Sequence, residues 1–241
     1  MRVAIHQPNY LPRLKVLQKL ASADLWVVLD SVQYCAREWQ NRAKLVSMHK
    51  QAAESWLSLP VHCPEGLKTL IKDVHICDGW DHYNAAKRAL LHNFRISKNW
   101  DAISTIVEEL KSTAEAKALT DICIPATIAM LVAGGCAVPK VIRASSLATS
   151  LHASGLMAEI CDLVGCTTYL ADSGAGNYLD IAVFKKCRVV WQEWNEPEDS
   201  WPEIVSWRNI SSINFLARAG SSRLKDHLMS GNFVDEPSYR A

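Results

Sequence analysis

The pattern of residues 1–30 restricts the fold more than any other part of this sequence. Val3-Ala4-Ile5 is a short apolar run bounded by polar residues, which is typical of a strand buried on both faces. Leucines then recur at helical spacing over residues 12–22, and Pro12 suits the first turn of a helix. A second apolar run follows at residues 25–29. This order predicts a βαβ unit, and therefore two parallel strands joined by a right-handed crossover.

The rest of the chain continues this alternation at both ends and is almost purely helical in between. Further strands are expected at residues 57–59, 71–76, 138–143, 167–171 and 188–194. Further helices are expected at residues 81–96, 101–117, 120–133, 150–164, near 178–186 and at 209–219, with Asp101 and Thr120 as N-caps and Gly220 after the last. The weakly patterned segment from Lys225 is expected to be peripheral.

These elements predict an α/β fold in a single domain over residues 1–241. The expected core is a doubly wound, mostly parallel sheet of the HUP or Rossmann-like kind. The helical stretch at residues 80–136 is expected to be an insertion within that domain.

Composition and charge narrow the class of protein further. Lys and Arg number 26 against 25 Asp and Glu, for a formal charge of +1, which argues against nucleic-acid binding through bulk charge. The eight cysteines lack the spacing of a small secreted domain. No signal peptide is recognisable, and no apolar stretch approaches the ~20 residues of a spanning helix. We expect a cytoplasmic protein with free thiols and no membrane contact; oligomeric state has no signal in the sequence.

The loop after the first strand is the strongest candidate for a functional site. In open α/β sheets, ligands bind beyond the carboxyl ends of the strands, and the following helix offers unpaired N–H groups to a phosphate or carboxylate. His6 can act as acid, base or donor, while Gln7, Asn9 and Tyr10 offer neutral hydrogen bonds. The structural alternative is a turn closed by Asn9 with Tyr10 packed as a lid. The loop has no glycine, so it is not a glycine-rich phosphate cradle.

Two further segments are expected at the same edge of the sheet. The one after the second strand offers a carboxylate, amides, an aromatic ring and a cation: Asp30, Gln33, Trp39, Asn41 and Arg42. Asp30 would orient His6, bind a sugar hydroxyl, act as a base or merely cap the turn. Arg42 with Arg37 would clamp an anion or form a surface salt bridge. The second segment, residues 172–178, adds Ser173, Gly174, Gly176 and Tyr178.

Signals for other kinds of site are weak. His62, Cys63, His75, Cys77 and His82 are metal-ligand types without a compact paired spacing, so no metal site is predicted. No Walker, GxSxG or GxGxxG sequence is present.

Several of these stretches resemble the signature of the WbqC-like protein family. The resemblance rests on AIHQPNYLP at residues 4–12, LDSVQY at 29–34, WQNR at 39–42, and a Ser-Gly, Gly and Tyr-Leu-Asp pattern within 169–180. The chain departs from the family at Arg13, where an aromatic residue is usual, and near Asn214, where the last helix usually carries an acid. The resemblance implies a role in O-antigen or related sugar or secondary-metabolite biosynthesis. The role proposed there is attachment of glycine or another aminoacyl group to an amino sugar.

The residues and the resemblance together predict a transferase that joins an aminoacyl or acyl group to the amine of a small activated substrate, such as a nucleotide-linked amino sugar. His6 or Asp30 would deprotonate the amine, and neighbouring polar groups would hold phosphate or carbonyl oxygens. One alternative is nucleotidyl transfer or amino-acid adenylation, as in HUP enzymes. ATP and Mg²⁺ would be the cofactors under this alternative only. Others are a transferase that takes its acyl group from aminoacyl-tRNA, and a non-enzymatic sugar-nucleotide binding protein.

Overall fold

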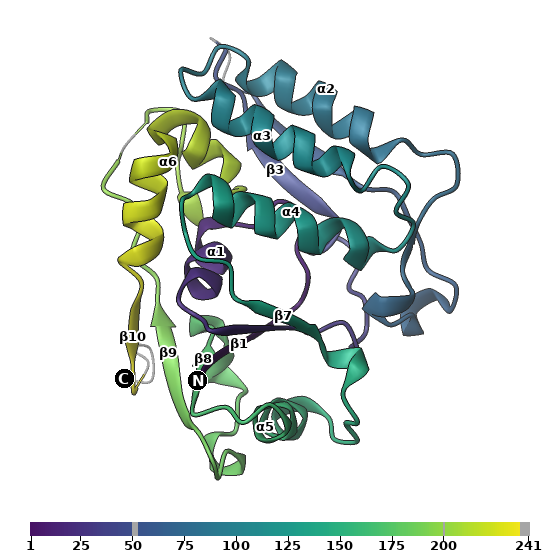
Figure 1. The fold of residues 1–241 in the computed structure, drawn as a ribbon, viewed down its shortest axis with the longest axis vertical. Helices are drawn as coiled ribbons and strands as arrows, with labels where there is room; N and C mark the ends of the chain where they lie inside the picture. Colours follow the sequence, from purple (N-terminus) through teal and green to yellow (C-terminus); the bar gives the residue numbers. More distant parts are fainter. Residues whose placement is uncertain (50–52, 200, 237–241) are drawn as a thin grey trace.

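The computed structural model describes residues 1–49, 53–199 and 201–236. A six-stranded sheet in the order β10-β9-β8-β1-β2-β7 lies at its centre (Figure 1). The strands are β1 (Arg2–His6), β2 (Leu25–Val28), β7 (Lys140–Arg143), β8 (Thr168–Ala171), β9 (Arg188–Glu193) and β10 (Asn232–Val234). All neighbours pair in parallel except β10, which runs antiparallel to β9. The expected mixed α/β class with a mostly parallel sheet is confirmed, and it is compatible with a Rossmann-like fold.

The strand order reverses direction beside β1. The chain places β2 and then β7 on one side of β1, and it returns to place β8 and β9 on the other side. In doubly wound sheets the crevice beyond the carboxyl ends of the strands opens at this reversal, because the connections on its two sides diverge. The loops after β1 and β8 therefore frame the position where such a fold takes a ligand.

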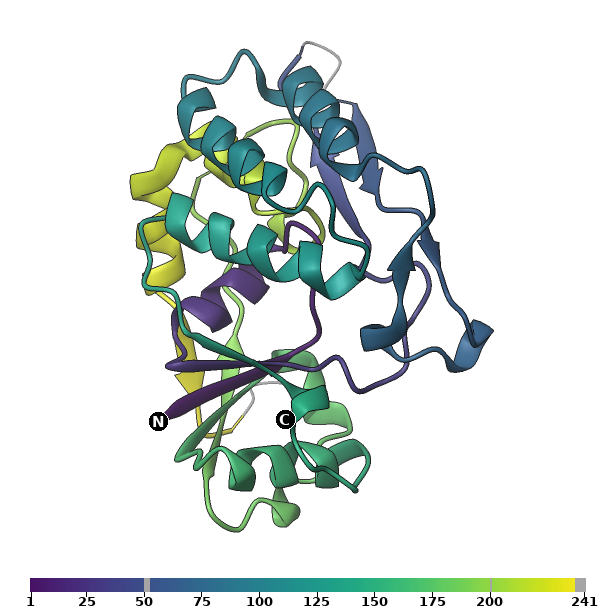
Figure 2. The ribbon, with the colours of Figure 1, turned by 45° about the vertical axis from the view of Figure 1, so that its right-hand side comes forward.

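Helices cover both faces of the sheet, so the strands are apolar on both sides. One face carries α1 (Leu14–Ala21), α4 (Leu119–Ala133) and α6 (Ile213–Met229), with α2 (His82–Phe94) and α3 (Trp100–Lys111) beyond them, while α5 (Ala153–Leu163) covers the other (Figures 1 and 2). The sheet has a hydrophobic core on each face. In β1, Ala4 packs into the core shared with α1, α4 and α6, whereas Val3 and Ile5 pack into the core shared with α5. Both cores are needed to bury a strand that alternates its side chains between faces. None of the described helices is long and apolar enough to span a membrane.

Shorter elements extend the connection between β2 and β7. They comprise a hairpin of β3 (Arg42–Val46) and β4 (Glu54–Ser58), a pair of β5 (Val61–His62) and β6 (His75–Ile76), and two 3₁₀ turns, Gly66–Lys68 and Ile71–Asp73. A strand was expected over residues 71–76, but only its last part is extended. Helices α2 to α4 occupy the stretch predicted as an insertion, and that division of the domain stays a prediction.

Two predictions about helices were wrong. No helix spans residues 178–186; only 3₁₀ turns occur, at Ser173–Asn177 and Ile181–Val183. The Asp180 carboxylate accepts a hydrogen bond from the Ala182 N–H, an Asx turn that competes with helix formation. Asp101 and Thr120 are not N-caps, whereas Asp81 caps α2 by accepting the Asn84 N–H.

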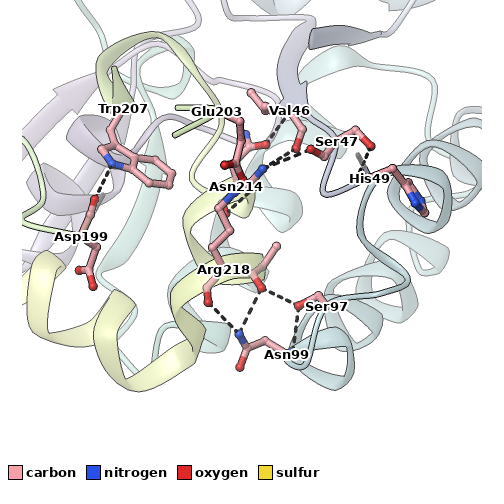
Figure 3. Close-up of polar contacts among 11 residues, drawn as sticks. Val46, Ser47, His49, Ser97, Asn99, Asp199, Glu203, Trp207, Asn214 and Arg218 are labelled. Carbon is pink, nitrogen blue, oxygen red and sulfur yellow. Dashed lines mark hydrogen bonds and ion pairs between the residues drawn. The ribbon is translucent and has the colours of Figure 1, made fainter. Parts of the chain in front are cut away.

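The C-terminal segment is integrated into the fold rather than peripheral as expected. Helix α6 runs to Met229 with a kink at Gly220, and β10 then joins the sheet edge. Before the kink, Asn214 accepts the Val46 N–H (Figure 3). Asn214 also donates to the Lys44 carbonyl, so it ties α6 to β3. An ionised carboxylate has no proton to donate in this bond, which explains why an amide side chain suits this position.

Gly220→Ala is expected to destabilise the protein. Gly220 has φ 84° and ψ 174°, a conformation that is essentially restricted to glycine. A Cβ there would also lie 2.7 Å from Asn99 Oδ1, and the Asn99 amide is already committed to the Ala217 carbonyl (Figure 3). We expect a loss of at least about 1–3 kcal/mol in the free energy of unfolding, measured by urea denaturation. Gly174→Ala, whose Cβ meets nothing within 4 Å, is the matched control; equal stabilities for the two variants would contradict the explanation.

Candidate active site

Three ionisable side chains meet where β1 and β8 end. His6 closes β1, Asp172 follows β8, and Lys19 comes from α1; we call these three residues the switch-point triad. The Lys19 ammonium donates to Asp172 Oδ2 at 2.6 Å and lies 3.0 Å from His6 Nδ1. Asp172 Oδ2 also lies 3.3 Å from His6 Nδ1. Helix α1 returns across the sheet and its side chains lean toward its N-terminus, so Lys19 points back to the carboxyl edge.

The electrostatics of the triad favour a neutral imidazole. Lys19 is completely buried, and its charge is balanced by Asp172. Burial, followed by the nearby Lys19 ammonium, lowers the pKa of His6 below its ordinary value of 6.5. Burial alone would raise the pKa of Asp172, but Lys19 and His6 hold it well below its usual range. Since the described contacts of the ring engage Nδ1, Nε2 is the nitrogen available to a substrate.

Positive charge exceeds negative charge around the triad. Arg13 and Lys15 both interact electrostatically with Asp172, and Lys15 also interacts with Arg208. Burial lowers the pKa of both Arg13 and Lys15, because it penalises their charged forms. Together with Lys19 these groups make four cations, against the two carboxylates of Asp172 and Glu38, an excess of two. An anionic group on a ligand would be attracted here.

Aromatic rings and guanidinium groups form a stack beside this charge. The Arg13 guanidinium lies 4.6 Å from the Trp39 ring centroid, and Trp39 lies 5.2 Å from Trp56. Arg42 lies 4.2 Å from Trp56 on the β3–β4 hairpin. Trp56 is 44% exposed, so a planar ligand can reach this stack.

Two adjoining cavities open near this centre, and His6 lines the first of them. The first, of about 380 Å³, is lined by His6, Gln7, Asp172, Tyr178 and apolar side chains that include Met157 and Leu179. The second, of about 420 Å³, shares Val32, Ala153 and Leu156 with it and reaches Gln33 and His152. Each is large enough for part of a small-molecule substrate.

Unpaired polar atoms concentrate in the two predicted loops. Among the described residues, five buried polar atoms without a hydrogen-bond partner fall within residues 9–13 and 41–42: Asn9 Oδ1, Tyr10 OH, Arg13 Nε, Asn41 Oδ1 and Arg42 Nε. A buried polar group without a partner costs free energy. Buried polar groups without partners are rare in folded proteins, so their concentration marks these two loops as candidates for function.

Backbone strain marks the same loops. Within the described ranges, the non-glycine residues with positive φ are Leu11 (46°), Arg37 (71°) and Ala153 (49°). Leu11 lies in the loop after β1, Arg37 follows β2, and Ala153 lines both cavities. This conformation disfavours residues with a Cβ, and where it persists it tends to cluster at functional sites.

The remaining predicted residues lie around this centre with different partners. Asp30 is fully buried and its carboxylate accepts both the N–H and the hydroxyl of Ser145, each at 2.8 Å. The Gln7 side chain accepts a hydrogen bond from Gln40 at 2.8 Å. The amides of Gln33 and Asn41 donate to backbone carbonyls, those of Leu67 and Leu59 respectively.

The glycine-containing segment follows Asp172 directly. Gly174 is exposed and Gly176 is buried, and Tyr178, 76% exposed, lines the first cavity. The side chain of Ser173 lies outside what the structure describes.

Sequence reasoning missed several residues of this centre. Lys19, Trp56 and Arg13 were not among the predicted site residues, and Asp172 was noted only as the first residue of the segment at residues 172–178. The detectable signal for Lys19 is its spacing: Lys15 and Lys19 lie four residues apart, on one face of a short helix.

The lowered pKa of His6 predicts a change of stability with pH. Just below pH 6.5 the unfolded chain binds more protons at this histidine than the folded chain does. The contribution of His6 is therefore present above that pH and lost as pH falls through its folded-state pKa. In urea denaturation from about pH 7 to about pH 5, wild type is expected to lose more stability than His6→Gln. His227, whose pKa is also lowered by burial, is common to both proteins; equal pH slopes would contradict the assignment.

The fold and the site together define a mixed α/β protein with a mostly parallel sheet, compatible with a Rossmann-like fold, and with a cationic, histidine-containing centre at the carboxyl ends of β1 and β8. Residues 7–221 match the WbqC-like protein family, and the chain therefore belongs to that family. It is 26% identical over 208 residues to the uncharacterized protein Rv1507c of Mycobacterium tuberculosis, a match that covers 82% of this chain and 84% of the relative. No solved structure matches the chain significantly.

Proposed function

We propose that the protein transfers an aminoacyl or acyl group to the amine of a small, anionic, activated substrate, such as a nucleotide-linked amino sugar. The observation that carries this proposal is the switch-point triad, where a neutral imidazole lines a cavity and the surplus cations Arg13 and Lys15 interact electrostatically with the neighbouring Asp172. Such a centre combines a proton acceptor with an anion site, and the reaction needs both.

His6 would serve as the general base. In the tautomer whose Nδ1–H is directed at Asp172 Oδ2, His6 Nε2 is unprotonated. As the amine nitrogen forms its bond to the acyl carbon, Nε2 takes one N–H proton, and Asp172 stabilises the resulting imidazolium beside it. The bond between the acyl carbon and its leaving group then breaks, and the leaving group recovers the proton from His6. Because burial lowers the pKa of His6 below 6.5, its imidazole is unprotonated at physiological pH and available to accept a proton.

The cations and the aromatic stack would bind the part of the substrate that does not react. Arg13 and Lys15 suit phosphate oxygens, and Trp39 and Trp56 suit a planar base or a sugar face. Gln7, Asn9, Tyr10, Asn41 and Arg42 are proposed to complete the hydrogen bonds, with Gln33, Ser173, Gly174, Gly176 and Tyr178 at the periphery. Asp30 remains a proposed site residue, and its two bonds to Ser145 suit a positioning role.

A thermal-shift panel tests the binding half of this proposal. A nucleotide-linked amino sugar at 100 times its Kd should add about 2.7 kcal/mol, which raises Tm by roughly 5–11 °C for a chain of this size. Arg13→Ala should abolish most of that shift, whereas Arg188→Ala, which breaks an exposed pair with Asp235 at the opposite edge, should preserve it. An unchanged shift in Arg13→Ala would contradict the proposed anion site.

The same panel separates the alternatives. Cations at the switch point also suit ATP, so stabilisation by ATP with Mg²⁺ alone would favour adenylation or nucleotidyl transfer. Stabilisation by aminoacyl-tRNA that weakens steeply with salt would identify tRNA as the donor. Saturable binding without any product would favour a non-enzymatic sugar-nucleotide binding protein.

A further inference from the structure

Three cysteine thiols converge at the edge of the sheet opposite the switch-point triad. Cys161 lies in the last turns of α5, Cys166 lies in the turn before β8, and Cys187 precedes β9. Their Sγ atoms all lie within 4.8 Å of one another. Cys161 and Cys166 are buried and Cys187 is half-buried.

The local backbone accounts for this convergence. Helix α5 ends in a Schellman motif: the Cys166 N–H donates to the Cys161 carbonyl at 2.9 Å, and the Gly165 N–H donates to Asp162 at 3.2 Å. Gly165 takes the positive φ of 69° that this motif requires. The turn folds Cys166 back against Cys161, and parallel pairing of β8 with β9 then brings Cys187 alongside.

The spacing suits a metal ion coordinated by three sulfurs. A metal–sulfur distance of about 2.3 Å places three trigonal sulfurs roughly 4 Å apart, so the thiols need to close by less than about 1 Å. Within the described residues, no His, Asp or Glu joins these cysteines as a fourth ligand. The nearest acid in sequence, Asp162, pairs with Lys186 at 2.8 Å.

We propose that Cys161, Cys166 and Cys187 bind a closed-shell thiophilic metal ion, Zn²⁺ or Cu⁺, as a three-thiolate site. The three thiols lose their protons as the metal–sulfur bonds form. The ion would join α5 to the starts of β8 and β9; the first turns of α5 line the first cavity, and β8 leads directly to Asp172. Its role is therefore to stabilise the scaffold of the site, without contact with the reacting atoms.

Titration of the fully reduced protein under anaerobic conditions tests this site. Cd²⁺ and Cu⁺ are the probes, because thiolate binding gives each an ultraviolet charge-transfer band. We expect the band to saturate at one ion per chain, with a higher Tm for the loaded protein. Metal retained after gel filtration distinguishes the two natural ions: Zn²⁺ added alone stays bound at one ion per chain if the site is a zinc site, whereas only Cu⁺ is retained if it is a copper site.

Cysteine variants show which thiols give rise to the charge-transfer band. Because Cys187 is only half-buried, the Cys187→Ala variant should fold, and it should lose the charge-transfer band. The Cys161→Ala variant should lose the band as well. Cys77→Ser is the matched control, because Cys77 neighbours Cys63 in the other group of metal-ligand residue types, and it should retain the band. A band that persists in Cys187→Ala, or vanishes in Cys77→Ser, would overturn the assignment. So would a wild-type protein that forms a disulfide among these cysteines and binds no metal.

Discussion

Lys19→Met is expected to lower the free energy of unfolding by about 3–5 kcal/mol, because it leaves the Asp172 carboxylate partly buried without its closest partner. For a chain of this size the loss corresponds to a Tm lower by roughly 6–20 °C. The methionine keeps most of the volume of the lysine, so the effect isolates the lost charge and hydrogen bonds. Urea denaturation followed by circular dichroism measures it.

Lys15→Met is the matched control for this prediction. Lys15 lies on the same helix, one turn earlier, and is only half-buried, so its loss should cost much less. In the double variant Lys19→Met/Asp172→Asn, the second substitution should restore part of the stability, because neither charge is then left unpaired. Equal losses of unfolding free energy for Lys19→Met and Lys15→Met would contradict a specific contribution of the Lys19–Asp172 ion pair to stability.

His6→Gln is expected to reduce kcat/KM for the proposed acyl transfer by roughly 10²–10⁴-fold, the usual contribution of a general base. Glutamine keeps a polar side chain of similar reach but accepts no proton at neutral pH. The measurement is the initial rate of product formation with the ligand identified by thermal shift. His49→Ala, which removes a ring bonded to the His92 carbonyl on the outer layer, should leave the rate unchanged. A His6→Gln rate within a few-fold of wild type would remove His6 from the chemistry.

The parts of the fold that sequence predicted well are those where a single periodicity decides the structure. Val3-Ala4-Ile5 and the run before Asp30 are buried on both faces, so they read as strands without any knowledge of their neighbours. The loop after β1 was recognisable because polar side chains there follow a buried strand directly. In the same way, the apolar stretch of α4 was long enough to be read as a helix.

The parts that were missed depend on contacts between distant segments. Lys19 is buried because β8 brings Asp172 to it, a pairing across 153 residues that no local pattern reveals. Trp56 joins Arg42 and Trp39 only when the β3–β4 hairpin forms. The convergence of Cys187 with Cys161 and Cys166 likewise requires the pairing of β8 with β9.

The switch-point triad is proposed to catalyse acylation of the amine of an anionic activated substrate. The most direct measurement is mass spectrometry of nucleotide-linked amino sugars after incubation with the protein and each class of acyl donor: aminoacyl-tRNA, an acyl carrier thioester, and an amino acid with ATP and Mg²⁺. We expect wild type to produce a sugar nucleotide heavier by one aminoacyl or acyl group, and His6→Gln to produce almost none. A sugar nucleotide that binds to wild type but stays unmodified with every donor, or a product formed equally well by His6→Gln, would contradict it.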